Sequence, residues 1–191
     1  MRGKLPYGNV NQLDEAIEYV CDKSGKHINK KKFHILCKII NHLQPKYVLE
    51  IGSYYGLSTI ALAQSECKPQ LSLLTHRKGD IEYLNHHMKS AHLSNIELLE
   101  SMPLSSEPKR FDFIYLHGAV AGKTILETIQ LARSISTPNG VILIDRLTQS
   151  EEARNEWKEV LRSGVAQMII DQKKRALIFL DTTLNRKNYF I

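Results

Sequence analysis

The sequence has few cysteines and no long apolar segment, and both absences narrow the kinds of protein it can encode. Its 191 residues contain three cysteines, Cys21, Cys37 and Cys67, none of them in a C-x-x-C pair. An odd number of widely spaced cysteines with no secretory leader predicts reduced thiols and a cytoplasmic location. No window approaches the roughly 18 apolar residues of a membrane-spanning helix. We find no internal repeat or low-complexity tract, so we expect a globular protein with no membrane segment.

The charge is moderately basic. Lys and Arg number 26 against 20 Asp and Glu, a formal net charge of +6. This balance permits an anionic substrate or nucleic acid but requires neither. Part of the excess lies in two short runs, Lys30–Lys32 and Lys173–Arg175, which are typical of solvated surface or hairpin turns. We therefore do not predict a nucleic-acid partner.

Hydrophobic periodicity predicts an α/β domain that begins with helices. Residues 11–43 form two helices separated at Ser24-Gly25, and Pro45 ends the second. Strands and helices then alternate, which indicates a parallel sheet with helices on both faces. The strands are expected at 47–51, 71–75, 96–99, 111–116, 141–144, 165–170 and 176–180, and the helices at 57–65, 80–91, 121–134 and 151–162. The polar turn at 171–175 makes the last two strands an antiparallel hairpin.

The most informative segment is K-Y-V-L-E-I-G-S-Y-Y-G-L-S-T-I-A-L-A-Q, residues 46–64. A buried strand ends in an acid and a glycine, a short loop carries a second glycine, and an apolar helix follows. Glycine is needed where the backbone turns tightly or approaches a ligand closely. The spacing Gly52-x-x-x-Gly56 differs from the dinucleotide fingerprint G-x-G-x-x-G. A plain strand-to-helix turn is the structural alternative.

The pattern E-I-G-S-x-x-G-x-S-T resembles motif I of the class I S-adenosylmethionine (SAM)-dependent methyltransferases. It is most similar to the branch with L-E-(I/L)-G-(T/S)-x-x-G-x-S-T, which includes the small-molecule O-methyltransferases. The segment after Asp145 also resembles the C-terminal half of bacterial members of this family. The resemblance implies a Rossmann-like, doubly wound, mostly parallel sheet of seven strands in the order 3-2-1-4-5-7-6. We accordingly predict a single domain, with an N-terminal helical extension at 1–45, a core at 46–181 and a C-terminal tail at 182–191.

The resemblance also implies cofactor contacts in the loop after the first strand. Gly52, Ser53 and Gly56 would bend around the amino-acid end of SAM, and Glu50 would face its ammonium group. Ser58 or Thr59 would bond the carboxylate, with help from helix N–H groups, or alternatively the two residues would cap the helix.

The loops after the other strands depart from the family pattern. Thr75 takes the place of the acid that grips the ribose, and the next acid, Asp80, is interpreted as a helix cap. Met102 stands near the expected adenine position, where it would pack on the base or fill the core. These replacements put SAM binding in question.

The final two loops contain the candidate catalytic residues, His117 and Asp145. The metal-dependent members hold a divalent cation with acids at these positions, but here only Asp145 is left of that set. Mg²⁺ needs several hard oxygen ligands, so we predict no metal site. His117 is interpreted either as a general base or as a residue that fills a vacated pocket. The other histidines, among them His86, His87 and His92, are expected at the surface.

Two functions stay open. The first is a metal-independent, SAM-dependent methyltransferase that acts on a small molecule and releases S-adenosylhomocysteine (SAH). The second is a catalytically inactive relative that keeps the fold as a binding or assembly module, because fold alone does not establish activity. The terminal hairpin and the N-terminal helices would supply a surface for a homodimer.

Overall fold

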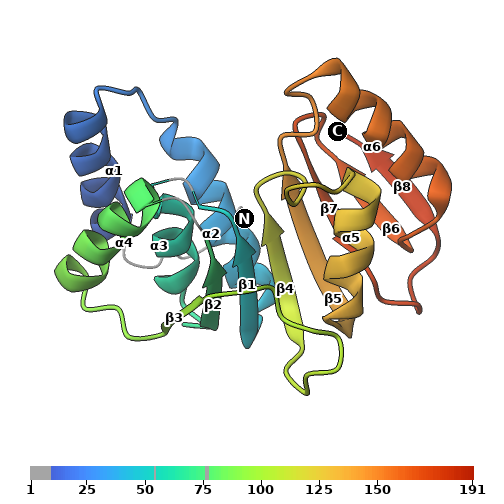
Figure 1. Ribbon diagram of the computed structural model, residues 1–191, viewed down its shortest axis with the longest axis horizontal. Coiled ribbons are helices and arrows are strands. Elements are labelled where there is room, and N and C mark those ends of the chain that lie inside the picture. Colours follow the sequence, from blue (N-terminus) through green and yellow to red (C-terminus); the bar gives the residue numbers. More distant parts are fainter. Residues whose placement is uncertain (1–9, 54, 76–77) are drawn as a thin grey trace, which may run out of the picture. The chain divides into compact units, whose positions relative to one another are not determined.

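The computed structural model describes residues 10–53, 55–75 and 78–191, and these form an α/β sheet structure (Figure 1). The helices are α1 (Val10–Ser24), α2 (Lys30–Leu43), α3 (Leu57–Ala63), α4 (Lys78–Ser90), α5 (Ile125–Ser134) and α6 (Glu151–Ser163). The strands are β1 (Tyr47–Ile51), β2 (Gln70–Leu74), β3 (Ile96–Leu99), β4 (Phe111–Leu116), β5 (Ser136–Asp145), β6 (Met168–Asp171), β7 (Arg175–Phe179) and β8 (Lys187–Phe190).

The strand order is β3-β2-β1-β4-β5-β7-β6-β8. The predicted Rossmann-like order 3-2-1-4-5-7-6 is therefore confirmed. An eighth strand, within residues 182–191, extends it beyond the seven strands expected. β8 pairs with β6 in parallel, with Ile169 opposite Asn188. The first nine residues, on which the expectation about a secretory leader rests, lie outside the described residues.

Contacts between residues divide the chain into two compact units, which are described separately. The first contains the N-terminal helices and residues 52–100, and the second contains residues 47–51 and 101–191. None of the helices in the described residues is both long and apolar enough to cross a membrane.

The first unit is organised around α3, whose residues are all buried. This helix contacts α1, α2, α4 and β2, which explains why a sequence of small and aliphatic residues forms it. Helix α2 begins at the N-cap Asn29, whose side chain accepts from the Lys31 amide, and ends at Gln44 in the left-handed conformation before Pro45. The predicted break between the first two helices and the end of the second are therefore confirmed.

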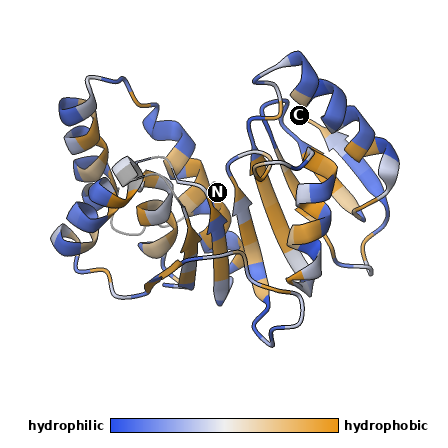
Figure 2. Ribbon diagram, in the orientation of Figure 1, coloured by the Kyte–Doolittle hydropathy of each residue, from blue (hydrophilic) through white to orange (hydrophobic). Residues whose placement is uncertain are grey.

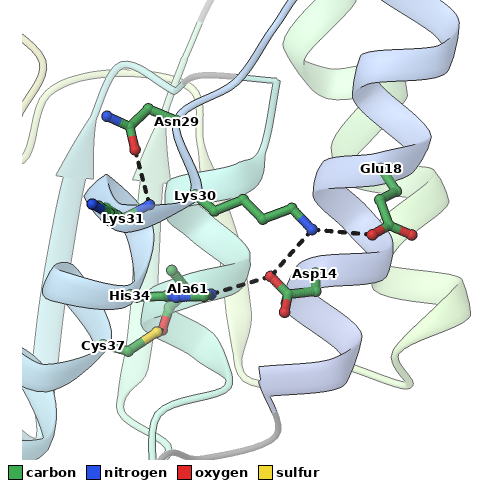
Figure 3. Close-up of polar contacts among 8 residues, drawn as sticks. All are labelled: Asp14, Glu18, Asn29, Lys30, Lys31, His34, Cys37 and Ala61. Carbon is green, nitrogen blue, oxygen red and sulfur yellow. Dashed lines mark hydrogen bonds and ion pairs between the residues drawn. The ribbon is translucent and has the colours of Figure 1, made fainter.

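Helices α1 and α2 are also joined by polar contacts on their surfaces (Figure 3). Lys30 Nζ lies 3.0 Å from Glu18 Oε1, and His34 Nε2 lies 3.1 Å from Asp14 Oδ1. On the buried side of α2, the Cys37 thiol donates to the Ala61 carbonyl, and burial raises its pKa to about 11. All three cysteines are free, as the sequence predicts.

The second unit is built on β4 and β5, whose aliphatic and aromatic residues are buried and give both strands orange stretches in Figure 2. β1, β4 and β5 run parallel, and β7 pairs with β5 in the antiparallel direction. Helix α5 packs on β5 and beside α6. It begins at Ile125, later than predicted, because Thr124 and Glu127 form a capping box there.

Two further local expectations need correction. The residues Pro138–Gly140 are typical of a turn before the fifth strand, but β5 begins at Ser136 and includes them. The pairing shifts register there, since Phe111 lies opposite Ser136 whereas Phe113 lies opposite Val141. The extra residues are therefore accommodated as an irregularity in the strand. Asp80 lies inside α4, which begins at Lys78, so it does not occupy the position before that helix.

Candidate active site

Strand register in the second unit places five polar side chains on one face of the sheet. Glu50 of β1 lies opposite Tyr115 of β4, and Tyr115 lies opposite Leu143 of β5. Side chains two residues apart on a strand share a face, so His117 and Asp145 follow Tyr115 and Leu143 on that side. Arg175 of β7 lies directly opposite Asp145. We call Glu50, Tyr115, His117, Asp145 and Arg175 the acid–histidine cluster.

The first part of this cluster is a buried pair between Glu50 and His117. Glu50 Oε1 lies 2.8 Å from His117 Nε2, and their side chains are 0% and 7% exposed. The His117 amide also donates to the Ile51 carbonyl, which continues the β1–β4 ladder and fixes the start of the following loop. In the tautomer in which His117 Nε2 donates to Glu50, the neutral imidazole has its lone pair on Nδ1. The pair can therefore hold a basic ring nitrogen in a fixed orientation.

The second part of the cluster is centred on Asp145, which is 4% exposed. The Tyr115 hydroxyl donates to Asp145 Oδ2 over 2.5 Å, and Arg175 Nε lies 3.0 Å from Asp145 Oδ1. Burial raises the pKa of Tyr115 well above its usual value, and the nearby Asp145 carboxylate adds to this. Tyr115 is therefore a protonated donor. Both Asp145 oxygens are engaged within the protein, which fits a positioning role.

The glycine loop of the first unit begins with Gly52 at a φ of +83°. This left-handed region is readily adopted by glycine alone, so the sharp bend predicted after the first strand is present. The Gly52 amide donates to the Leu74 carbonyl at the end of β2. Ser53 is buried, and its Oγ accepts from the Gly56 amide over 3.0 Å and lies 3.4 Å from Thr59 Oγ1. Short-range hydroxyl bonds therefore fix the shape of the loop.

Gly56 has a packing role of its own. Its φ is +73°, and a Cβ built on it would lie 3.1 Å from the Leu84 Cα and 3.2 Å from the Leu84 amide nitrogen of α4. The close approach of α4 thus requires a glycine whether or not a ligand is bound. Tyr55, also left-handed, packs its ring edge-on to Tyr83 of α4 at 5.1 Å, and its hydroxyl accepts from Lys26 over 2.6 Å.

The other predicted cofactor residues differ in exposure. Ser58 and Thr59 are fully buried at the second and third positions of α3, and the N-cap residue is Gly56, which makes no side-chain cap bond. Neither residue therefore occupies the N-cap position of α3. Thr75 directly follows β2 and is half-buried. Met102 is half-buried in the segment after β3, in the second unit.

Reasoning from the sequence misses two members of the cluster and misplaces one histidine. Tyr115 and Arg175 resemble ordinary strand residues, and only the paired register reveals that they flank Asp145. His87 is expected at the surface, whereas it is 3% exposed on α4. A signal is present in the sequence, because His87 lies three residues after Leu84 on the buried side of that helix.

No group of three or more His, Cys, Asp or Glu side chains able to hold a metal ion occurs in the part of the chain that the structure describes. The absence of a metal stays a prediction.

Comparisons with known proteins agree on the fold. No protein-family model matches the chain, and no curated protein matches it in sequence. Among solved structures, an O-methyltransferase of tomaymycin synthesis from Streptomyces achromogenes, in complex with SAM, has a TM-score of 0.68 at 16% identity, over 95% of this chain and 92% of that chain. The O-methyltransferase from Bacillus cereus, in complex with SAH, has a TM-score of 0.66 at 17% identity, over 94% and 92%. An SAH-bound methyltransferase from Podospora anserina has a TM-score of 0.67 at 13% identity, over 94% and 98%. Identities this low establish the shared fold alone.

Proposed function

We propose that this protein is a SAM-dependent methyltransferase that acts without a metal on a small-molecule acceptor. The observation that carries the proposal is the buried Glu50–His117 pair at the ends of adjacent parallel strands. In open α/β sheets ligands bind beyond these strand ends. The methyltransferases with the same fold, two of which are crystallised with SAH and one with SAM, support the choice of donor.

The residues at the end of β1 and directly after it suit the amino-acid end of such a donor. Glu50 is in the strand, and a left-handed glycine, Gly52, and a buried serine, Ser53, follow the strand. An acid suits an ammonium group, and hydroxyl groups and backbone N–H groups suit a carboxylate. Thr75 would make one hydrogen bond to a ribose hydroxyl, and Met102 would pack against the base. The fit is weaker at the ribose, because a threonine cannot grip both hydroxyls as a carboxylate does.

The chain's own residues would remove a proton from the acceptor. When bound, the donor supplies an electrophilic methyl group on a sulfonium and is converted to SAH. His117, held at Nε2 by Glu50, takes the proton of the acceptor hydroxyl or amine at Nδ1. Glu50 stabilises the imidazolium that results, since the two groups are buried together. Asp145 would help to position His117 indirectly. It holds the Tyr115 hydroxyl, and the Tyr115 ring centroid lies 4.3 Å from that of His117.

Cofactor binding is tested first, by calorimetric titration with SAM and SAH. We expect micromolar affinity for the wild type and none for Gly52→Val, since a side chain there fills the bend and strains the backbone. Gly25→Val is the matched control: Gly25 has a φ of +64°, and a Cβ added to it would meet no atom within 4 Å. Equal SAH affinity in the Gly52 and Gly25 variants would show that the loop is assigned wrongly.

Catalysis is tested with His117→Ala. The variant is expected to keep its SAH affinity but to lose about 10²–10⁴-fold in methyl transfer. His42→Ala, an exposed residue on α2, is the control. An undiminished rate in His117→Ala removes the general-base role.

A second candidate is a non-catalytic module with this fold. It is favoured by Thr75, Met102 and His117, which stand where the resemblance implies acids. If calorimetric titrations with millimolar SAM and SAH gave no binding heat, the result would favour this alternative over the enzyme. For either function a homodimer is proposed on the exposed apolar side chains at strand β8, Tyr189, Phe190 and Ile191.

A further inference from the structure

A pocket of about 220 Å³ lies in the second unit at the ends of β4 and β5. It is lined by the loop after β4, the loop after β5 and the first turns of α5 and α6. Gly118 directly follows His117, and Arg146 directly follows Asp145, so the pocket begins one residue beyond two members of the acid–histidine cluster.

Arg146 reaches this pocket at a conformational cost. Its φ is +67°, which is unfavourable for a residue with a Cβ. Its stem lies beside Gly118, since a Cβ on Gly118 would meet Arg146 Cδ at 3.7 Å. The side chain is exposed, and no hydrogen bond or ion pair of its guanidinium is found with the described residues. A strained backbone that presents a cation without a partner is typical of a functional position.

The charges around the pocket select the kind of ligand. Lys123 supplies a second cation, and Glu152 and Glu156 supply two carboxylates. Glu156 is occupied by the Ile125 amide, 2.9 Å away. The fork of a guanidinium matches a planar carboxylate, whereas a phosphate dianion would be repelled more strongly by the two glutamates.

We propose that this pocket binds a carboxylate group of the methyl acceptor through Arg146, with Lys123 as a second cationic contact. The inference rests on the proposed function and names its substrate class: a small hydroxylated monocarboxylate. The acceptor O–H proton goes to His117 Nδ1, a bond forms between that oxygen and the methyl carbon, and the sulfonium S–CH₃ bond breaks to leave SAH. Arg146 takes no part in the proton transfer and determines specificity.

The test uses two probes of the same shape, 4-hydroxybenzoate and its neutral analogue 4-hydroxybenzamide, titrated into the full chain with and without saturating SAH. We expect the benzoate to bind at least about tenfold more tightly, and the Arg146→Gly variant to lose that preference. Arg146→Lys is expected to keep part of it, because the charge stays but the fork is lost.

The matched control is Lys173→Gly. Lys173 is an exposed cation at a φ of +65° in the β6–β7 turn, and it does not line the pocket. Both glycine variants remove a left-handed non-glycine residue, so both melting midpoints are expected to rise by about 2–4 °C. Only Arg146→Gly is expected to change ligand preference. A lower melting midpoint for Arg146→Gly would indicate a structural role and contradict the proposal.

The remaining outcomes are decisive as well. Equal binding of the two probes, or no binding of either at about 10 mM, overturns the assignment. Tighter binding of phenyl phosphate than of 4-hydroxybenzoate overturns the choice of a monocarboxylate. Absence of SAH binding removes the proposed function. If the wild-type protein binds SAH but does not prefer the carboxylate probe, this inference alone fails.

Discussion

The two compact units each bury a histidine, but in different surroundings. In the second unit, His117 lies 2.8 Å from the buried carboxylate of Glu50. In the first unit, His87 lies among α1, α3 and α4, and its Nε2 has no hydrogen-bond partner in the described part of the chain. Burial lowers the pKa of His87 to about 4, with a smaller contribution from His86. The first unit thus buries a histidine whose Nε2 has no polar partner among the described residues, whereas the second places a carboxylate beside its buried histidine.

This contrast extends to how each unit is held together. The ion pairs of the first unit lie at the surface of α1 and α2 (Figure 3), and its interior depends on close packing, as at Gly56. The second unit places Asp145 and Arg175 inside the sheet. Buried paired charges cost desolvation energy, and the proton transfer that we propose involves one such buried pair, Glu50 and His117, of the second unit.

The strongest test of the contrast is Asp145→Ala. It would leave the Arg175 guanidinium and the Tyr115 hydroxyl without their buried acceptor, so we expect the free energy of unfolding in urea to fall by about 3–5 kcal/mol. Tyr115→Phe removes one bond and leaves the ion pair, and is expected to cost about 1–2 kcal/mol. Equal losses for the two variants would mean that the ion pair adds nothing.

The next effect is expected in the first unit, where packing replaces charge. Gly56→Ala adds left-handed strain and crowds the Leu84 backbone, for a loss of about 2–3 kcal/mol. Gly25→Ala has the strain but no close neighbour, so it should cost about 1 kcal/mol. Urea denaturation measures both losses. If Gly25→Ala is as harmful as Gly56→Ala, the approach of α4 is not what selects the glycine.

The buried neutral histidine predicts a pH dependence. The pKa of His87 is about 4 in the folded protein and near 6.5 when unfolded, so the unfolded chain binds the additional proton first. Stability is therefore complete above about pH 6.5 and falls as the pH drops towards 4, by about 1–3 kcal/mol. Unfolding midpoints measured across this range should show the slope in the wild type and a weaker one in His87→Leu. Identical slopes would place the titration elsewhere.

The smallest effect is expected at the surface pairs. Asp14→Asn weakens the contact with His34, but the Asp14 side chain is 33% exposed and water and salt screen the charge. The melting midpoint should move by less than about 2 °C at physiological salt. If Asp14→Asn lowered the melting midpoint as much as Asp145→Ala does, surface and buried ion pairs would contribute equally to stability, and the contrast between the two units would not hold.

The sequence is informative where one element determines its own structure. The strands at 47–51, 96–99 and 111–116 have the predicted bounds, because apolar runs between polar residues mark them. The strand at residues 187–190 is missed, since K-N-Y-F is exposed and has no apolar alternation. The Tyr115–Asp145–Arg175 contacts could not be predicted either, because they depend on the register of three strands rather than on any local pattern. His117 and Asp145 are found at the strand ends where the sequence predicts them, but the residues that contact them could be identified only from the structure.

The ion pair between β5 and β7 also guards against misalignment. β7 lies between β5 and β6 in the sheet, so its register must be correct with both neighbouring strands. A shift of one residue in the β5–β7 pairing would turn the Arg175 side chain to the opposite face of the sheet. The Asp145 carboxylate would then be buried in an apolar interior without its arginine partner. The carboxylate that holds Tyr115 would thus disfavour a misaligned β7, because the Arg175 contact would be lost completely rather than lengthened.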